Sequence, residues 1–257
     1  MSALRFIERP SPNFDARTRA VDLVVLHYTG MHDGEAALAR LTDPAPVAGR
    51  FPGPWQDKST APDAPLARVS SHYVVGEDGA IYRVVQENQR AWHAGASSWK
   101  GEGDVNARAI GIEIVNGGHD FGLPEFPDAQ IVSVIALLRD VLHRNQLDAS
   151  RVVGHSDIAP DRKLDPGEKF PWKRLADAGV AIWPQAAASH LESTSGEAIS
   201  QLQQRLAAFG YDVVQSGAMD GATRNALSAF QRRFRPSCIN GAPDAETTAL
   251  LASLTRV

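Results

Sequence analysis

The segment that most constrains the fold is a short apolar run that ends in a histidine. Residues 21–27 read Val-Asp-Leu-Val-Val-Leu-His. A β-branched run of this length, with almost no polar alternation, is typical of a strand that is buried on both faces. We therefore expect a buried strand that delivers His27 at its carboxyl end.

Further strands and one strong helix follow along the chain. Residues 72–75 and 81–85 flank the sequence Gly-Glu-Asp-Gly, which predicts a β-hairpin. Residues 110–115 and 151–154 are predicted strands, and in residues 128–144 the apolar positions recur at spacings of three and four, which predicts an amphipathic helix. Strands mixed with a helix in this way predict an α/β domain with a mixed central β-sheet flanked by helices.

The chain divides into a larger and a smaller predicted unit. Residues 1–184 would form the α/β domain, which includes a long proline-rich surface loop over residues 44–65, and residues 185–196 look like a linker. In residues 197–257 the pattern Gly-Ala-x-Asp-x-x-Thr-x-x-x-Leu occurs twice, starting at Gly217 and Gly241. Each Asp can cap a helix, so we expect a small all-α three-helix domain at the C-terminus.

Composition excludes several classes of protein. The net charge is −4 and the basic residues are scattered, which argues against nucleic-acid binding. No apolar run is long enough for a transmembrane segment. Cys238 is the only cysteine, so neither an intrachain disulfide nor a cysteine-cluster metal site is possible. The oligomeric state is not indicated.

Charged residues near the N-terminus bear on where the protein works. Arg5, Glu8 and Arg9 interrupt the apolar core that a secretory signal would need. The sequence as written therefore predicts a cytoplasmic protein. A periplasmic or outer-membrane location is the alternative if a leader has been removed.

Two histidines and an aspartate suggest a metal site. His27 and His155 each follow a short predicted strand, and Asp165 lies on the polar loop after His155. Catalytic zinc commonly takes three ligands of these types and keeps a fourth position for water. The spacing is dispersed and weakly specific, however. From the residues alone, His27 could equally be a hydrogen-bonded strand-end histidine, and Asp165 a turn residue before Pro166.

Larger motifs make the assignment more specific. The first two-thirds of the chain resembles the zinc-dependent type 2 N-acetylmuramoyl-L-alanine amidase family, to which peptidoglycan-recognition proteins are related. The segments that carry this resemblance are Leu26-His27-Tyr28-Thr29, Ser71-His72-Tyr73-Val74-Val75, Trp92-His93-Ala94-Gly95, Ile110-Gly111-Ile112-Glu113, and Gly154-His155 through Asp165-Pro166-Gly167. The C-terminal segment resembles a three-helix peptidoglycan-binding domain. Peptidoglycan or soluble muropeptides are the partners that both resemblances imply.

The resemblance also implies roles for individual residues. His27, His155 and Asp165 would bind one Zn²⁺ ion, and Glu113 and Lys163 would act beside the reacting carbonyl. Glu113 suits proton transfer and Lys163 suits stabilisation of an oxyanion. Without the motif, Glu113 would be an ordinary solvent-facing carboxylate and Lys163 a solvated loop lysine.

A second group of residues is expected to line the substrate groove, although aromatic and imidazole side chains near strands often serve only as core or rim. This group comprises Tyr28, Arg68, His72, Trp92 and His93. Arg68 would hold a stem-peptide carboxylate. His32, His119, His143 and His190 belong to no motif and are assigned no role.

The expected activity is hydrolysis of the amide between N-acetylmuramic or anhydro-muramic acid and the L-alanine of the stem peptide. Two alternatives stay open. One is a peptidoglycan-binding protein without catalysis, against which the complete ligand set argues. The other is a zinc peptidase that cuts within the stem peptide, since the same metal chemistry serves any amide.

Overall fold

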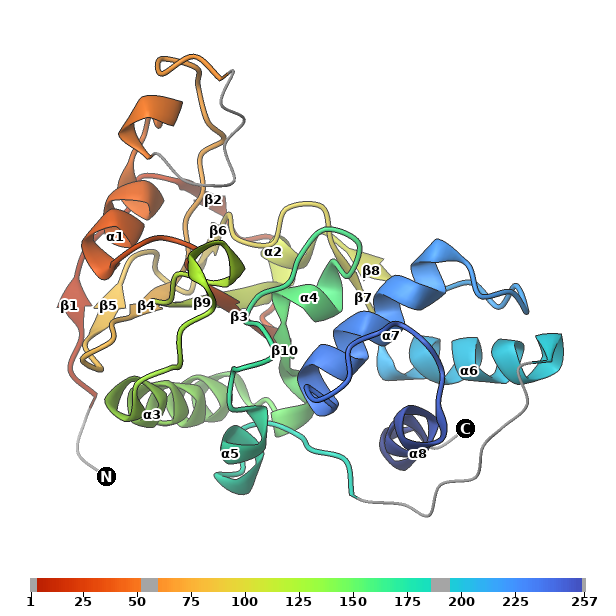
Figure 1. Ribbon diagram of the computed structural model, residues 1–257. Helices are drawn as coiled ribbons and strands as arrows, with labels where there is room; N and C mark the ends of the chain where they lie inside the picture. Colours follow the sequence, from red (N-terminus) through yellow and green to blue (C-terminus); the bar gives the residue numbers. More distant parts are fainter. Residues whose placement is uncertain (1–3, 52–59, 186–194, 256–257) are drawn as a thin grey trace.

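The computed structural model describes residues 4–51, 60–185 and 195–255 (Figure 1). A six-stranded sheet forms its centre. The strands lie in the spatial order β1 (Ile7–Glu8), β5 (Ile81–Arg83), β4 (Tyr73–Val75), β9 (Ala109–Ile114), β3 (Leu23–Tyr28) and β10 (Val152–Gly154). Neighbouring strands are parallel except for the hairpin of β4 and β5. The predicted mixed sheet and its hairpin are therefore confirmed.

The register of the three strands at one side of this sheet places the ends of β3, β9 and β10 together. His27 of β3 is the partner of Glu113 in β9, and Gly154 of β10 is the partner of Leu26. His155 follows Gly154 directly, so it leaves the sheet beside His27. Parallel pairing thus brings residues from three distant parts of the chain to one edge.

One face of the sheet is covered by α3 (Asp128–Asn145), with α5 (Trp172–Asp177) beside it. Val24 and Leu26 of β3 contact this layer in a cluster that includes Ile131 and Leu138 of α3. All four side chains are almost fully buried. Each contributes about 1.5–3 kcal/mol through removal of apolar surface from water, which explains the apolar stripe seen in the sequence of α3.

Helices from the C-terminal part of the chain pack against part of the other face, at the β10 side of the sheet. These are α6 (Gly196–Phe209), α7 (Gly221–Phe234) and α8 (Ala245–Leu254). Leu23 and Val25 of β3 belong to one apolar cluster with Leu206 of α6 and Phe230 of α7. The three predicted helices are present, and they share a core with the sheet.

The two copies of the repeated motif behave as predicted. The Asp220 side chain accepts a hydrogen bond from the Thr223 backbone N–H, and Asp244 does the same for Thr247. Gly217 and Gly241 adopt φ angles of 71° and 64°, a region that glycine enters without strain. Local sequence therefore sets where α7 and α8 begin.

Shorter elements complete the fold around the edge of the sheet. Within the described residues, two small antiparallel ribbons pair β2 (Phe14–Ala16) with β6 (Gln89–Ala91) and β7 (Ser98–Trp99) with β8 (Glu102–Gly103). The helix α1 (Gly34–Thr42) packs near β4, and α2 (Val105–Arg108) and α4 (His155–Ile158) are single-turn helices. Three 3₁₀ turns are η1 (Ala48–Arg50), η2 (His119–Phe121) and η3 (Ala149–Arg151).

Two predicted segments fall partly outside the described residues. The proline-rich loop contains η1 and a bridge between Val47 and Pro65, but residues 52–59 are not described. Residues 186–194 of the predicted linker are not described either. The division into residues 1–184, 185–196 and 197–257 stays a prediction. Within the described part of the chain, no helix has the length and apolarity that crossing a membrane requires.

Candidate metal centre

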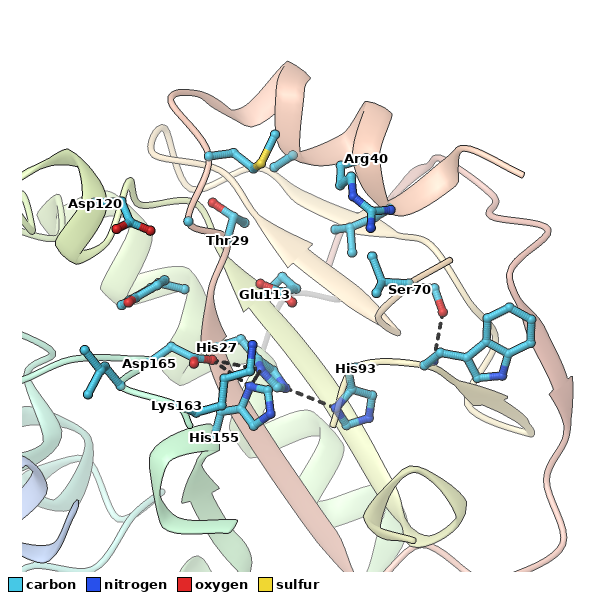
Figure 2. Close-up of a pocket in the computed structure, with 18 of the residues that line it drawn as sticks. His27, Thr29, Arg40, Ser70, His93, Glu113, Asp120, His155, Lys163 and Asp165 are labelled. Atoms are coloured by element: carbon cyan, nitrogen blue, oxygen red, sulfur yellow. Dashed lines mark hydrogen bonds and ion pairs between the residues drawn. The ribbon is translucent and has the colours of Figure 1, made fainter. Parts of the chain in front are cut away.

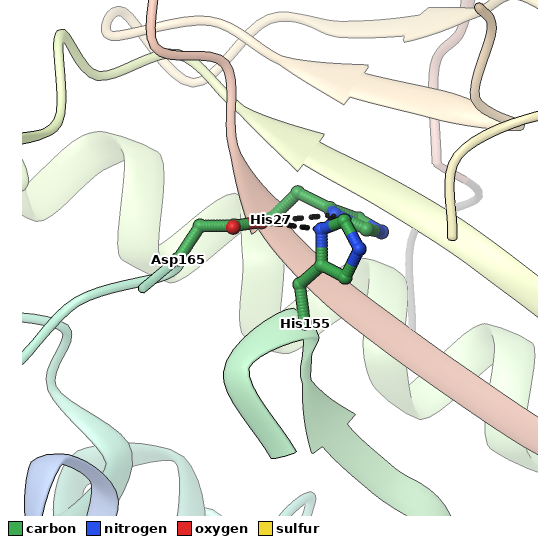
Figure 3. Close-up of side chains that lie close together, drawn as sticks. All are labelled: His27, His155 and Asp165. Atoms are coloured by element: carbon green, nitrogen blue, oxygen red, sulfur yellow. Dashed lines mark hydrogen bonds and ion pairs between the residues drawn. The ribbon is translucent and has the colours of Figure 1, made fainter. Parts of the chain in front are cut away.

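Three buried side chains converge at the carboxyl edge of β3 and β10 (Figure 3). His27 Nδ1 lies 2.9 Å from His155 Nδ1 and 3.0 Å from Asp165 Oδ2, and His155 Nδ1 is also 3.0 Å from Asp165 Oδ2. The three come from the end of β3, the start of α4 and the loop that returns after α4. The structure therefore brings the predicted ligands together.

The segment Trp92–Gly95 orients both histidines. His155 Nε2 donates to the Ala94 carbonyl at 3.1 Å, and His27 Nε2 lies 3.0 Å from His93 Nδ1. We assign His27 Nε2 as the donor in this pair, so the Nδ1 atoms of the two histidines are the ones that face each other. Ligand histidines in proteins are typically held in this way by a bond from the second ring nitrogen.

Burial and charge tune these groups. Burial, and then the neighbouring His155, lower the pKa of His27 to about 4, so this ring is neutral near pH 7. Burial alone raises the pKa of Asp165, but the charges and hydrogen bonds of His155 and His27 hold it far below its usual value. The site therefore offers the neutral imidazole of His27, the ring of His155 and the carboxylate of Asp165.

This donor set fits a zinc ion. Two ring nitrogens and a carboxylate oxygen face one another at about 3 Å, an arrangement of ligand atoms that a cation stabilises. The separations are close to the roughly 3.3 Å between two ligand atoms of a tetrahedral ion bound at about 2.0–2.1 Å. Two histidines and a carboxylate are also a ligand type that catalytic zinc uses.

Glu113 stands beside the three ligands on the same edge of the sheet (Figure 2). Its Oε2 atom is buried and has no hydrogen-bond partner among the described residues. Burial, and then the nearby charge of Asp165, raise the pKa of Glu113 well above its usual value. A buried carboxylate oxygen without a partner is costly, so its position points to a group that binds there during function.

Lys163 extends from the loop between His155 and Asp165 and lies in front of the histidines in Figure 2. Its backbone N–H donates to the Ala159 carbonyl at 3.0 Å, which fixes the turn that carries it. Its positive charge acts on both Glu113 and His27, whose pKa values it lowers. Glu113 and Lys163 therefore meet at one site, as the motifs predict.

These groups line a cavity of about 520 Å³. Tyr28, Trp92 and His93, three of the predicted substrate-groove residues, lie on its wall. His93 is 8% exposed, and the bond to His27 occupies its Nδ1 atom. Its direct contact is thus with His27, a candidate metal ligand, and it also borders the cavity.

Two other predicted groove residues are placed differently. His72 is completely buried and is not on the cavity wall: its Nδ1 accepts from the Gly111 N–H at 2.9 Å, and its Nε2 lies 3.1 Å from the Gln89 carbonyl. It faces away from the α3 layer into the interior beneath His93, so the prediction of a substrate contact is corrected to a structural role. Arg68 is exposed, and its guanidinium stacks 5.0 Å from the centroid of the Trp92 ring. It does not line the cavity.

Several residues of the site have no sequence signal. His119, which was assigned no role, lies on the cavity wall, where its Nδ1 is 3.1 Å from Tyr28 Oη and its Nε2 is 3.0 Å from Glu168. Arg40 of α1 lies on the opposite wall, and its Nη1 is buried without a hydrogen-bond partner in the described residues. Asn106 Oδ1 accepts from the backbone N–H of both His93 and Ala94, which fixes the segment that orients the ligands. These contacts join residues far apart in sequence and could not be derived from local patterns.

Comparison with known proteins agrees with this geometry. Residues 17–168 match the N-acetylmuramoyl-L-alanine amidase family, and residues 195–251 match a peptidoglycan binding domain. The N-acetylmuramoyl-L-alanine amidase AmiD of Escherichia coli is 34% identical over 96% of this chain and 89% of its own length. The structure of AmiD with anhydro-N-acetylmuramic acid-L-Ala-D-γ-Glu-L-Lys superposes with a TM-score of 0.73 over 93% of this chain and 91% of AmiD.

A second solved structure is similar over most of its length. AmpDh3 of Pseudomonas aeruginosa in complex with anhydromuramic pentapeptide is 30% identical, with a TM-score of 0.69 over 91% of both chains. The family match covers more than half of this chain, and the similarity to AmiD runs through both units. The chain therefore belongs to the N-acetylmuramoyl-L-alanine amidase family.

Proposed function

We propose that this protein is a zinc-dependent hydrolase of the amide between N-acetylmuramic or anhydro-N-acetylmuramic acid and the L-alanine of a peptidoglycan stem peptide. One observation carries the proposal. His27, His155 and Asp165 converge within a cavity that also holds Glu113 and Lys163, in a chain of the amidase family.

The three ligands would hold the ion through His27 Nδ1, His155 Nδ1 and Asp165 Oδ2. When bound, zinc supplies polarisation of the amide carbonyl and a lowered pKa for the attacking water. Glu113 is the general base: its carboxylate takes a proton from the water and passes it to the amine nitrogen of L-alanine as the C–N bond breaks. The products are a muramic acid carboxylate and a stem peptide with a free amine.

Lys163 stabilises the negative charge that develops on the carbonyl oxygen. A fixed cation in a partly buried cavity needs little reorganisation when that charge appears, which is why its effect on the barrier exceeds the effect of a solvated lysine. Tyr28 borders the same space, and burial followed by the Asp165 charge raises its pKa to about 12. Tyr28 therefore stays protonated and serves as a hydrogen-bond donor.

The cavity also carries a cation suited to the stem peptide. Arg40 lies on the wall, and its buried Nη1 atom has no hydrogen-bond partner among the described residues. Arg68, the arginine that the sequence suggested for this task, instead stacks on Trp92 outside the cavity. Planar guanidinium groups bind carboxylates through paired hydrogen bonds. Arg40 is accordingly our candidate for binding a stem-peptide carboxylate.

Mass spectrometry of products tests the activity. The substrate is a soluble anhydromuramyl tripeptide, assayed with purified protein, with protein treated with a strong chelator, and with chelated protein to which zinc has been returned. We expect free anhydromuramic acid and a tripeptide that begins with L-alanine in the first and third reactions only. Intact sacculi, tested in parallel, show whether polymer or soluble fragment is preferred.

The alternatives give different results in the same assay. A zinc peptidase would leave L-alanine attached to the sugar and release an amine further along the stem. A binding protein would retain muropeptide or sacculi without any new amine. Full activity after complete removal of zinc would contradict the proposed mechanism.

A further inference from the structure

A buried ion pair joins the C-terminal helices to the turn that carries a metal ligand. Arg233 of α7 places its Nη1 atom 2.7 Å from Asp157 Oδ2 in α4, and the two side chains are 2% and 0% exposed. Asp157 lies two residues after His155. The contact therefore lies immediately behind the metal centre, although α7 contributes none of the three ligands.

Asp157 is bound from several directions at once. Tyr211, which follows α6, donates from its hydroxyl to Asp157 Oδ1 at 2.7 Å, and the Gly154 backbone N–H donates to Oδ2 at 2.8 Å. Arg233 Nη2 also donates to the Val152 carbonyl at 2.9 Å. Two of the three donors to this carboxylate thus come from the C-terminal helical unit, and the same arginine holds the first residue of β10.

The turn that Arg233 and Tyr211 hold connects two of the candidate ligands, His155 and Asp165. Gly154 ends β10 and His155 begins α4. The Ser156 backbone N–H donates to the Asp165 carbonyl at 2.9 Å, so α4 and the Asp165 loop are tied together. A rotation of this turn would move His155 Nδ1 relative to Asp165 Oδ2, and metal affinity depends on the position of each ligand atom.

The surrounding packing keeps the contact closed. Trp99 stacks edge-on against Phe209 and Tyr211, with centroids 5.6 and 5.4 Å apart, and the Arg233 guanidinium lies 4.2 Å from the Trp172 ring centroid. A buried ion pair is stable only while both partners are present and hydrogen-bonded, because either charge alone is strongly disfavoured in the interior. The helical unit and the ligand turn are thus coupled.

We propose that Arg233 and Tyr211 are positioning residues for the metal centre, which hold His155 in its ligating orientation through Asp157. The helical unit, in addition to any contact with the cell wall, is then part of the scaffold of the active site. This inference rests on the proposed zinc-dependent function.

Two full-length variants test the inference, each with a matched control. Tyr211→Phe removes only the hydroxyl that binds Asp157. Its control is Tyr73→Phe, which removes the hydroxyl of a tyrosine that is equally buried as a residue and whose 2.8 Å bond goes to Glu87, away from the metal site. Arg233→Met removes the buried cation. Its control is Arg235→Met, which breaks the ion pairs with Asp244 and Glu246 inside the helical unit.

The primary measurement is the affinity for Zn²⁺, obtained by competition with a chromophoric chelator. We expect Tyr211→Phe and Arg233→Met to weaken zinc binding about 10- to 100-fold, the range seen when partners of ligand residues are removed, while both controls match wild type. On a soluble muropeptide at saturating zinc, kcat falls in the two test variants and KM stays near the wild-type value. Sedimentation with sacculi is unchanged.

A double variant shows whether the effect passes through Asp157. Arg233→Met combined with Asp157→Asn removes both buried charges. The combined loss in zinc affinity should be smaller than the product of the two single losses, because the second change relieves the unpaired charge left by the first. If Arg233→Met alone fails to fold, Tyr211→Phe and the zinc affinity of the double variant relative to wild type decide the question.

The outcomes separate this inference from the proposed function. The positioning role would be overturned if two variants kept the zinc affinity and kcat of wild type: Tyr211→Phe, together with either folded Arg233→Met or the double variant. Such a result would leave the zinc mechanism intact. A wild-type protein that binds no zinc, or that needs none for activity, would instead remove the proposed function. A loss of sacculus binding with unchanged zinc affinity would assign these residues to the wall-binding surface alone.

Discussion

The two faces of the central sheet are built from alternate residues of the same strands but carry different kinds of side chain. On the face toward α3, Val24 and Leu26 meet an apolar layer. On the opposite face, Val25 is followed by His27, and the neighbouring strand presents Glu113. Since strand residues alternate between faces, a register shift of one residue would turn the apolar side chains toward the site and His27 toward the α3 layer. The comparison teaches that the α3 face supplies stability and the opposite face supplies the site.

Loss of a ligand on the functional face should have the largest effect. Asp165→Ala removes one of three converging ligand atoms, so we expect activity to fall by more than the roughly 100-fold that loss of a ligand's partner costs. Zinc content per chain and release of stem peptide measure this. If the variant kept its metal and its activity, Asp165 would not be a ligand.

Glu113→Gln tests the chemistry without removing a ligand. The amide has nearly the same shape as the carboxylate but cannot accept the proton, so kcat should fall by about 10²–10⁴. Zinc content should stay at the wild-type level. Activity close to wild type would transfer the role of base to another group, and a loss of zinc would show that Glu113 also supports the metal.

A substitution on the α3 face should produce the reverse pattern. Leu138 is fully buried in the α3 layer, so Leu138→Ala should lower the free energy of unfolding by about 2–5 kcal/mol, measured by urea denaturation. Zinc affinity of the folded variant should not change. Val132→Ala is the control, because Val132 lies on the same helix with 52% of its surface exposed and should shift stability by about 0.5 kcal/mol or less. Weakened zinc binding in Leu138→Ala would show that the two faces are not independent.

The smallest expected effect concerns a buried histidine on the functional face. Burial, and then the Arg17 charge, lower the pKa of His72 to about 3, below the roughly 6.5 of an unfolded chain. The unfolded state therefore binds the proton first, and stability is complete above pH 6.5 and falls as the pH drops from there toward 3. This one group accounts for about 2 kcal/mol of loss between pH 8 and pH 5.

His72→Asn checks that value. The asparagine oxygen can still accept from the Gly111 N–H, but it does not titrate. The variant is expected to lose less stability than wild type between pH 8 and pH 5, by about 2 kcal/mol, in denaturation curves at both values. An identical pH dependence in the two proteins would show that His72 is protonated as easily in the fold as outside it.

Local patterns predicted much of the fold. Three predicted segments correspond to observed elements: the apolar run at residues 21–27, the hairpin around Asp78-Gly79 and the apolar stripe of α3. They were predictable because the burial of their side chains follows the local pattern of the sequence. The capping aspartates fixed the starts of α7 and α8 for a similar reason, since a cap involves residues only three positions apart.

The candidate site was only partly predictable. His27, His155 and Asp165 were found because whole motifs resemble a known family, whereas their spacing alone was weakly specific. His119 was missed because its partners Tyr28 and Glu168 are 91 and 49 residues away. His72 was expected in the groove because it belongs to one of the motifs. It lies directly before β4, however, and its side chain is buried in the interior, with its ring centroid 5.8 Å from that of His93.

By itself the sequence determined the main buried strands and their hairpin, the long helix α3, where α7 and α8 begin, and which side chains are chemically able to bind zinc. Tertiary structure alone decided that the ligand atoms meet within 4.8 Å of one another, that Arg40 and not Arg68 reaches the cavity, and that Arg233 holds the ligand turn across 76 residues. The physical reason is the separation in sequence over which each kind of interaction acts. Propensities and caps act over a few neighbouring residues, whereas strand register and the burial of paired charges depend on the packing of the whole chain.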